Sequence, residues 1–323
     1  MPITFRKSVV TRAIYIWKEL LDTSKAEISA LGCEIKMIGI IYNPLSRKGV
    51  NRHRVMDIRK ILDDNNFPYE YRETECPMDG IRVAREMSET CDTIIAVGGD
   101  GTVNEVINGG LEKGVTYGIL PFGSGNDASR SLHVFEKTDE ELADMIMHPN
   151  PRDMDCGYAL GRIYLQYVTF GIVSTVVKCY QNLKKPGKMA YPKAIFKALR
   201  IHKAKHYHVK LPDREFDCFA DFIAVQNIPT CGGGLYTNPN GKDDDRQLEL
   251  IIINHKSFFR LLRNAISLMS GKLYKQKNVD FIPVTEWCDV TADETETGSI
   301  DGELLDFSEF HAELYERPIK MLH

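Results

Sequence analysis

The stretch AVGGDGTVNEVINGG, residues Ala96 to Gly110, decides the fold of this chain. It starts at the end of an apolar run, passes through glycines at positions 98, 99 and 101, and continues with the spacing of an amphipathic helix. Glycines at such a strand-to-helix turn let backbone N–H groups approach an anion closely, and the helix N-terminus adds a partial positive charge. The stretch therefore predicts a phosphate-binding loop in an α/β domain.

An acid, Asp100, stands among these glycines. A carboxylate beside a phosphate is repelled unless it meets Mg²⁺, takes a proton from a hydroxyl or holds a polar ligand group. Glu105 has two interpretations. It can form a capping box as the N3 residue with Thr102 as N-cap, or it can contact the ligand. Asn104 is polar, early in the helix and next to the expected phosphate, which favours ligand contact.

Strand and helix patterns alternate on both sides of this stretch. Short apolar runs at 37–44, 68–74, 92–99 and 116–121 are separated by helical patterns at 53–66, 79–89 and 102–114. Alternation with short connections predicts an α/β domain with a parallel sheet and helices on both of its faces.

Beyond about residue 155 the pattern changes. Strand patterns at 162–172, 206–227, 248–254 and 288–295 dominate, interrupted by a basic helical stretch at 184–204 and an apolar helix at 257–271. This half predicts a β-rich, largely antiparallel second domain.

Composition limits the classes of function. The chain has 323 residues, of which 43% are hydrophobic and 27% charged, and its formal net charge of -4 does not suggest a nucleic-acid binder. Between Lys178 and Arg214, however, eleven Lys and Arg face a single acid, which predicts an anionic partner on one face. The eight cysteines are scattered without a C-x-x-C pair, which indicates reduced thiols and a cytoplasmic location.

A second glycine-rich loop follows the strand pattern at 116–121. Gly123, Gly125 and Ala128 match the dinucleotide fingerprint G-x-G-x-x-A, but they come late in the domain instead of in its first strand-to-helix turn. No Walker A motif, H-E-x-x-H motif or zinc-ligand spacing is found in the sequence. A dehydrogenase is therefore disfavoured.

Five motifs then occur in a characteristic order: NPLSRKG (43–49), GGDGTVNEVING (98–109), PFGSGND (121–127), CGGGLYTNP (231–239) and DGE (301–303). In this order they resemble the diacylglycerol kinase catalytic-domain family, and most closely its soluble bacterial lipid kinases, which are related to sphingosine and ceramide kinases. The resemblance runs from about residue 37 to the C-terminus.

The resemblance implies an ATP-dependent lipid kinase that converts diacylglycerol to phosphatidic acid. The alternatives are a kinase for another lipid alcohol such as phosphatidylglycerol or a sphingoid base, a soluble kinase of the NAD-kinase type, and a catalytically silent lipid- or nucleotide-binding module. It also implies a nucleotide-binding domain over 37–154, completed by 308–323, and a lipid-binding domain over 155–307. Residues 1–36 form an extension in which Trp17, Leu20 and Leu21 have helical spacing, as in a surface helix or a membrane-touching one.

By the same resemblance, Glu303 is the proton acceptor for the lipid hydroxyl, Asp301 its partner or a magnesium ligand, and Asp100 part of an ATP–magnesium site. The residues implied for ATP are Asn43, Pro44, Ser46, Thr74, Gly98, Gly99, Asp100, Gly101, Thr102, Asn104, Glu105, Ser124, Gly125 and Asn126. Without the resemblance, SIDGELL (299–305) predicts a hairpin turn.

The family also carries Mg²⁺ in its second domain. Asp245, with the backbone carbonyls of Lys242 and Gln247, matches that position, since magnesium prefers oxygen ligands. A solvated acidic turn is the alternative, because Arg246 replaces a family glycine. Arg47 likewise stands where the family's N-P-x-S-G motif has glycine. Either this loop has a different conformation from the family's, or the Arg47 side chain reaches a phosphate.

A lipid acceptor requires a membrane surface. The stretch KKPGKMAYPKAIFKALRIHKAKHYH (184–208) mixes basic and apolar residues and predicts peripheral association with an anionic membrane, although a solvated helix packed on the β domain has the same composition. FFRLLRNAISLM (258–269) predicts either core or a wall of the acyl-chain pocket. The sequence leaves a homodimer open.

Overall fold

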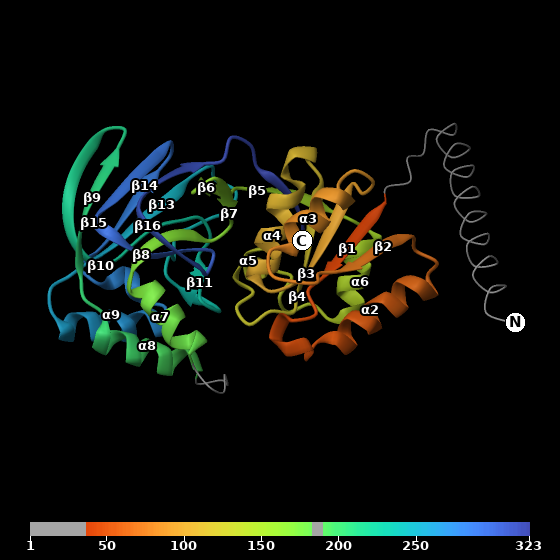
Figure 1. Cartoon of the computed structure of the whole chain (residues 1–323), viewed down its shortest axis with the longest axis horizontal. Helices are drawn as coiled ribbons and strands as arrows, with labels where there is room; N and C mark the ends of the chain where they lie inside the picture. Colours follow the sequence, from red (N-terminus) through yellow and green to blue (C-terminus); the bar gives the residue numbers. More distant parts are fainter. Residues whose placement is uncertain (1–36, 183–189) are drawn as a thin grey trace, which may run out of the picture. The chain divides into compact units, whose positions relative to one another are not determined.

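The chain is described by a computed structural model that covers residues 37–182 and 190–323. The N-terminal extension with Trp17, Leu20 and Leu21 lies outside the described residues, as does the start of the basic stretch with Lys184, Lys185 and Lys188. Two sheets organise the rest (Figure 1).

The first sheet has six strands in the order β2-β1-β3-β4-β17-β5, parallel except for the last pair. The strands are β1 (Ile38–Tyr42), β2 (Tyr69–Glu73), β3 (Thr93–Gly98), β4 (Thr116–Pro121), β5 (Pro151–Met154) and β17 (Ile319–Leu322). The helices between them are η1 (Ser46–Gly49), α2 (Arg52–Asp64), α3 (Asp79–Met87), α4 (Asp100–Gly110), η2 (Leu111–Lys113), α5 (Asp127–Ser131) and α6 (Asp139–Met147).

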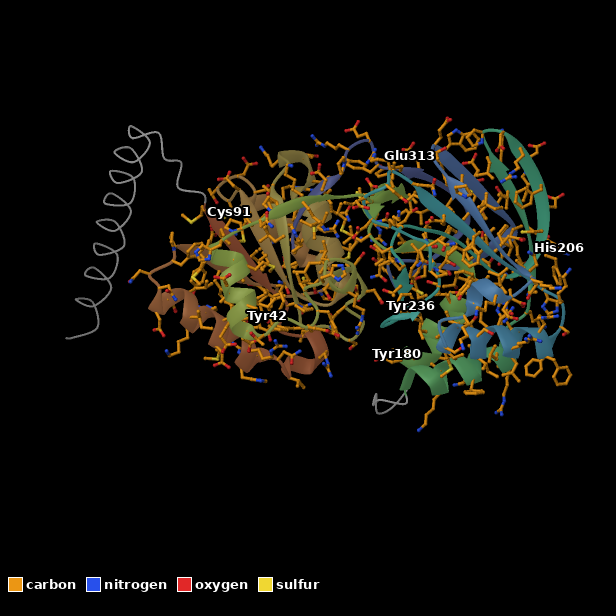
Figure 2. All side chains as sticks on the ribbon, turned by 180° about the vertical axis from the view of Figure 1, so that it is seen from behind. Tyr42, Cys91, Tyr180, His206, Tyr236 and Glu313 are labelled. Carbon is orange, nitrogen blue, oxygen red and sulfur yellow. The ribbon has the colours of Figure 1, made fainter. Side chains whose placement is uncertain are left out.

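Apolar side chains hold this first layer together. α3 packs against α4 and α2 against α6. On α2, Val55, Ile58 and Leu62 are buried, as their helical spacing predicts. Tyr42, labelled in Figure 2, ends β1 with only 1% of its surface exposed. The predicted α/β class is confirmed.

The second sheet has nine strands in the order β14-β13-β10-β8-β15-β16-β6-β7, with β9 paired to β10 and β15. All its pairs are antiparallel, which confirms the predicted β-rich class. Its strands are β6 (Gly157–Ala159), β7 (Arg162–Tyr164), β8 (Tyr167–Gly171), β9 (Lys205–Leu211), β10 (Arg214–Gln226), β13 (Leu248–Asn254), β14 (Val279–Val284), β15 (Trp287–Ile300) and β16 (Glu303–Leu314).

Three α-helices lie along one side of this second part in Figure 1: α7 (Ile172–Gln181), α8 (Ala190–Ile201) and α9 (Phe258–Met269). The short elements β11 (Thr230–Cys231), β12 (Leu235–Tyr236) and η3 (Leu273–Lys275) complete it. The core of the sheet includes Phe170, whose ring contacts those of Tyr207, Phe307 and Phe310.

Sequence patterns did not predict α7. Its sequence IVSTVVKCYQ is rich in β-branched residues, which favour strands. The helix forms because Ile172, Val176 and the buried Cys179 pack against Ala194 and Ala198 of α8, so tertiary contacts outweigh local propensity.

The C-terminal segment is divided between the two sheets. Residues 308–314 belong to β16 and pair with β15, whereas β17 pairs with β4 and β5. The segment that joins the first sheet is therefore shorter than the predicted 308–323.

Candidate active site

The two glycine loops touch each other through their backbones. The first leads from β3 into α4, and the second leads from β4 into α5. A Cβ atom at Gly123 would lie 2.1 Å from the Cα of Gly99, and one at Gly99 would lie 3.1 Å from the Cα of Gly123. A side chain at Gly123 would collide with the backbone of Gly99, and one at Gly99 would be tight, so the packing of the two loops favours glycine at both positions.

Asp100 holds the second loop in place. Its Oδ2 accepts a hydrogen bond from the N–H of Asn126 at 2.7 Å, and its Oδ1 accepts one from the N–H of Asp127 at 2.8 Å. A Cβ at Gly125 would come within 2.5 Å of the same Oδ2. Burial, reinforced by the Asp127 carboxylate, raises the pKa of Asp100 to about 7. Its oxygens are thus engaged by N–H groups of the chain.

Asp127 continues this network into the second part of the fold. It is 1% exposed, and its two oxygens accept hydrogen bonds from the N–H groups of Gly233 and Gly234, each at 2.7 Å. Both glycines have positive φ, of 87° and 92°, which aims their N–H groups at one carboxylate. Sequence analysis did not single out Asp127. An acid directly after a glycine-rich turn was the signal available in the sequence.

The open part of the site lies at the start of α4. Gly101 is exposed, and a Cβ there would meet no atom within 4 Å. The N-cap residue is Gly99, and no side chain caps the helix. Ser124 of the second loop is exposed as well. The first turn therefore has N–H groups available for an anion, and the predicted phosphate site stays a prediction.

The predicted capping box is wrong, because α4 starts at Asp100, before Thr102. The Thr102 hydroxyl instead accepts a hydrogen bond from Asn43 Nδ2 at 2.9 Å. Glu105 accepts from the N–H of Gly80 at 3.0 Å and from that of Met78 at 3.3 Å. It therefore caps the neighbouring helix α3.

The loop after β1 is tied to both glycine loops. Besides its bond to Thr102, Asn43 accepts from the N–H of Leu45 at 3.0 Å, and Ser46 donates to the carbonyl of Phe122 at 3.1 Å. Pro44 lies between these residues. Arg47 has a φ of 46°, so it takes the left-handed conformation in place of glycine.

Thr74 and Gly98 lie next to this region. Thr74 is buried, and its N–H donates to the carbonyl of Tyr42 at the end of β1. A Cβ at Gly98 would meet the hydroxyl of Thr102 at 2.6 Å.

Asp301 sits in a two-residue turn between β15 and β16, as the hairpin pattern predicted. Asp301 and Gly302 have φ values of 46° and 84°, the signature of a type I′ turn. The Asp301 carboxylate accepts from the N–H groups of Leu165, Gln166 and Tyr167 at 2.9, 2.8 and 3.1 Å. Burial raises the pKa of Asp301.

Asn104 joins this turn to the first domain. Its Nδ2 donates to Asp301 Oδ2 at 2.9 Å and to the carbonyl of Ile163 at 3.0 Å. Asp301 therefore accepts four hydrogen bonds from the chain and positions the turn that carries Glu303.

Glu303 is exposed and pairs with Arg162 at 2.7 Å. Burial raises the pKa of Glu105, and the charge of Glu303 contributes to the same shift, which places Glu303 near α4. Of the three predicted catalytic acids, Glu303 has no N–H group of the described backbone bound to its carboxylate. No sequence pattern pointed to Arg162.

Comparison with known proteins identifies the family of this chain. Residues 37–159 match the diacylglycerol kinase catalytic domain, and residues 166–320 match the YegS C-terminal NAD kinase beta sandwich-like domain. The chain belongs to the diacylglycerol kinase family. A diacylglycerol kinase of Staphylococcus saprophyticus is 31% identical over 234 residues, which cover 70% of this chain and 75% of that one.

Other members of the family are more distant in sequence. A diacylglycerol kinase of Bacillus subtilis is 23% identical over 84% of this chain and 93% of its own length. Two solved structures from Bacillus anthracis share the fold. One aligns with a TM-score of 0.74 at 23% identity over 89% of this chain and 95% of its own. The other, described as a diacylglycerol kinase, has a TM-score of 0.67 at 20% identity and covers 89% and 96%.

Arg246 stands next to Asp245, the residue that the resemblance implied as a magnesium ligand. Arg246 has a φ of 58° and donates through its Nη1 to Asp155 Oδ1 at 2.9 Å, and its Nη2 donates to the carbonyls of Tyr315 and Glu316 at 3.1 and 3.3 Å. Its backbone N–H also donates to Asp155.

These residues do not fit a divalent cation. Asp245 is exposed. Partial desolvation by the surrounding chain raises the pKa of its carboxyl group, while the neighbouring Lys242 ammonium lowers it. The nearby Asp155 carboxylate is already neutralised by Arg246. Across 37–182 and 190–323, no group of three or more His, Cys, Asp or Glu is arranged to hold a metal.

An apolar cavity of about 90 Å³ lies among the helices of this family's second domain. Its walls come from α7, α8, α9 and the segment Cys231–Thr237. Tyr167, whose N–H donates to Asp301, and Gly232, next to Gly233, also line it. The 258–269 helix, predicted as core or pocket wall, lines this cavity through Leu261 and Leu268.

No helix within the described residues has the length and apolarity needed to cross a membrane.

Proposed function

We propose that this protein transfers the γ-phosphate of ATP to the hydroxyl of a lipid alcohol, with diacylglycerol as the first acceptor to test. One observation carries the proposal. The apolar cavity reaches Gly232, and the next two residues, Gly233 and Gly234, bind Asp127 at the glycine loops. An apolar chain held in the cavity would thus present its polar end beside a phosphate-binding turn.

The donor side uses the first domain, proposed as residues 37–154. Backbone N–H groups at Gly101 and Thr102, together with the exposed Ser124 hydroxyl, bind the phosphates. Asp100, Asn126, Asn43 and Ser46 hold these loops in shape through their hydrogen bonds. Mg²⁺ bound together with ATP would supply positive charge to the phosphates.

On the acceptor side, Glu303 takes the proton of the lipid hydroxyl. It is exposed and directly follows a turn that is held in place, because the Asp301 carboxylate in that turn accepts four hydrogen bonds. Arg162 holds the Glu303 carboxylate in the resting chain and orients it. Positioning supplies most of the rate enhancement in phosphoryl transfer. Asp100, which holds the glycine loops, and Asp301, which holds the turn before Glu303, therefore serve catalysis without touching the reacting atoms.

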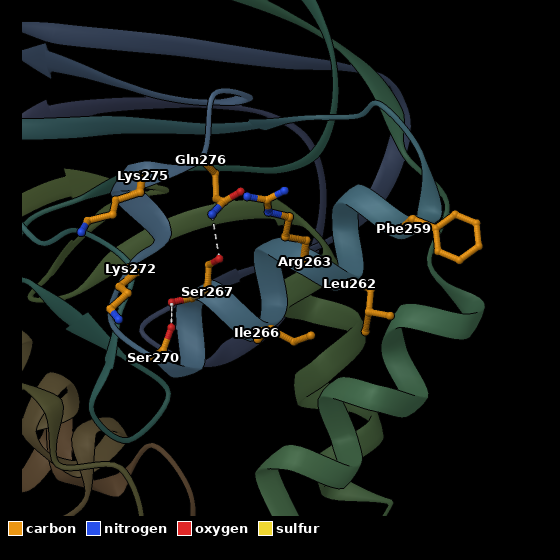
Figure 3. A pocket seen from close by; sticks show the side chains of 9 residues that line it. All are labelled: Phe259, Leu262, Arg263, Ile266, Ser267, Ser270, Lys272, Lys275 and Gln276. Carbon is orange, nitrogen blue, oxygen red and sulfur yellow. Dashed lines mark hydrogen bonds between the residues drawn. The ribbon is translucent and has the colours of Figure 1, made fainter.

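The outer surface of the second domain supports peripheral membrane binding. Phe196 and Ile201 on α8 and Phe258, Phe259 and Met269 on α9 are exposed apolar residues. A hollow beside α9 is lined by the basic residues Arg263, Lys272 and Lys275 (Figure 3). Phe259 and Ile266 of α9 also line it. Apolar residues that enter the interface and cations that meet anionic headgroups are the composition of a membrane-contact face.

The decisive experiment incubates purified protein with labelled ATP, Mg²⁺ and a panel of diacylglycerol, ceramide, sphingosine and phosphatidylglycerol, with NAD in a parallel reaction. Label in an organic-phase lipid supports the proposal. Label in NAD phosphate alone would support the soluble-kinase alternative instead. A chain that binds ATP and transfers no label to any acceptor would be a silent binding module.

A further inference from the structure

Asn264 is a polar residue in the middle of an apolar helix face. On α9 it follows Leu261 by three residues and precedes Ala265 and Leu268 by one and four residues. All four side chains line the apolar cavity. Asn264 has 1% of its surface exposed. The pattern of this face would place an apolar side chain at the position.

Both polar atoms of this side chain, Nδ2 and Oδ1, are buried and have no hydrogen-bond partner. Three other buried asparagines of the described chain, Asn227, Asn238 and Asn278, each lack a partner only at Oδ1. Buried amides are normally paired because leaving them unpaired destabilises the fold. An unpaired amide on the wall of a cavity is therefore a group prepared for a ligand.

The chemistry of the missing partner follows from the two atoms. Nδ2 donates and Oδ1 accepts, so full pairing requires a ligand with both an acceptor and a donor. An ester linkage offers acceptors alone and would leave Oδ1 unpaired. An ether offers only a weak acceptor. A secondary amide or a hydroxyl near the lipid linkages supplies the N–H or O–H that Oδ1 needs.

We propose that Asn264 determines acceptor specificity, selecting lipids that carry an amide N–H or a hydroxyl in the linkage region over lipids with only ester or ether linkages. This inference rests on the proposed lipid-kinase function. It names an N-acyl or hydroxylated lipid alcohol as a better acceptor than diacylglycerol, whose acyl linkages are esters alone. The amide or hydroxyl meets Asn264 while the apolar chains contact Leu261 and Leu268.

The test compares three acceptors with the same chains and the same free primary hydroxyl, differing in one linkage: secondary amide, ester or ether. Wild-type kcat/KM should fall in that order, by about ten- to a hundredfold from amide to ether. Asn264→Leu, of similar volume, should raise KM for the amide lipid with little change in kcat, and so level the series. Its thermal stability should be equal or higher, because a buried unpaired amide has been removed.

Leu268→Met is the matched control, since it changes the same cavity without adding or removing a polar group. It should shift KM for all three lipids together and keep their order. Equal wild-type rates on the three lipids, or an unchanged order in Asn264→Leu, would overturn the role of Asn264 and leave the kinase function standing.

If no acceptor takes label, the proposed function fails and binding decides on Asn264 separately. Amide and ether lipids whose hydroxyl is methylated are then titrated against both proteins, with thermal stabilisation as the signal. Tighter binding of the amide lipid by wild type alone supports the inference. Equal binding of the two lipids by wild type refutes it and indicates that Asn264 is satisfied by buried water.

Discussion

At the scale of single residues, the acids of this site divide by what surrounds their oxygens. Asp100, Asp127 and Asp301 each accept two or more backbone N–H groups, and each ties a glycine-containing turn to another part of the chain. Glu303 is exposed and meets a side-chain cation. Carboxylates bound by several N–H groups hold geometry, whereas an exposed carboxylate on a fixed turn can exchange a proton with substrate.

Glu303→Gln should lower the rate of phosphate transfer by at least about a hundredfold, because the amide cannot accept the lipid proton. Nucleotide binding, measured by titration with a fluorescent ATP analogue, should be unchanged. Arg162→Gln is the matched control, which removes the partner of Glu303 and should reduce the rate less. A Glu303→Gln variant with wild-type turnover would show that another group takes the proton.

The pKa of Asp100, raised from 3.8 to about 7, makes stability depend on pH. The native chain binds a proton more tightly at this residue than the unfolded chain does, so stability from Asp100 is greatest below about pH 4 and declines towards pH 7. Asp100→Asn does not titrate there. The melting temperature of wild type minus that of the variant should fall from pH 5 to pH 7 and then level off above pH 8. A difference that grew with pH would mean that the N–H groups around Asp100 lower its pKa.

At the scale of elements, the site depends on how closely two strand-to-helix turns approach. β3 and β4 are parallel neighbours, so the turns after them leave the sheet at the same edge. Gly99 and Gly123 allow these turns to touch, whereas Gly101 borders open space. Glycine therefore meets close-packed backbone at positions 99 and 123 and open space at position 101.

This difference predicts opposite results for two Gly→Ala changes. Gly123→Ala should destabilise the fold by about 2 kcal/mol or more, because its Cβ would collide with backbone that cannot move aside. Gly101→Ala should leave the melting temperature within about 1 °C and weaken ATP binding, because its Cβ enters the open space. Denaturant unfolding and ATP titration distinguish the two effects. Equal loss of stability in both variants would contradict the assignment of the open space to phosphate.

At the scale of the whole molecule, the C-terminal strand connects the two sheets. The chain leaves β16, passes Tyr315 and Glu316, and returns to the first sheet as β17. Arg246 binds the carbonyls of this passage and the buried Asp155 at the same time. The guanidinium, with five donors in a planar fork, can make these contacts with the carboxylate and the two carbonyls together.

Arg246→Gly should therefore destabilise the chain by about 1–3 kcal/mol, since Asp155 keeps a buried charge with fewer partners. Chelation with EDTA in the absence of nucleotide should not change the wild-type melting temperature. In the variant, added Mg²⁺ should recover part of the loss. A wild-type chain that melts earlier in EDTA would show that a metal is bound despite Arg246.

The sequence determined the class of this protein. Glycines at 98–101 and 123–125, the alternation of patterns before residue 155 and the strands after it predict the α/β and β-rich parts, because turn chemistry and hydrophobic periodicity are local properties. The same local patterns predicted the Asp301–Gly302 hairpin. They failed for α7, where packing against α8 outweighs the strand propensity of its residues.

Only the tertiary structure decided which polar groups are free. Sequence cannot show that Asp100 binds Asn126, that Asp127 binds Gly233, or that Asn264 has no partner at all, because these pairings join segments far apart in the chain. A hydrogen bond depends on distances within a few tenths of an ångström, and those are set by the packing of whole elements. Residue type therefore fixes which chemistry is available, and the fold determines which residue is left to perform it.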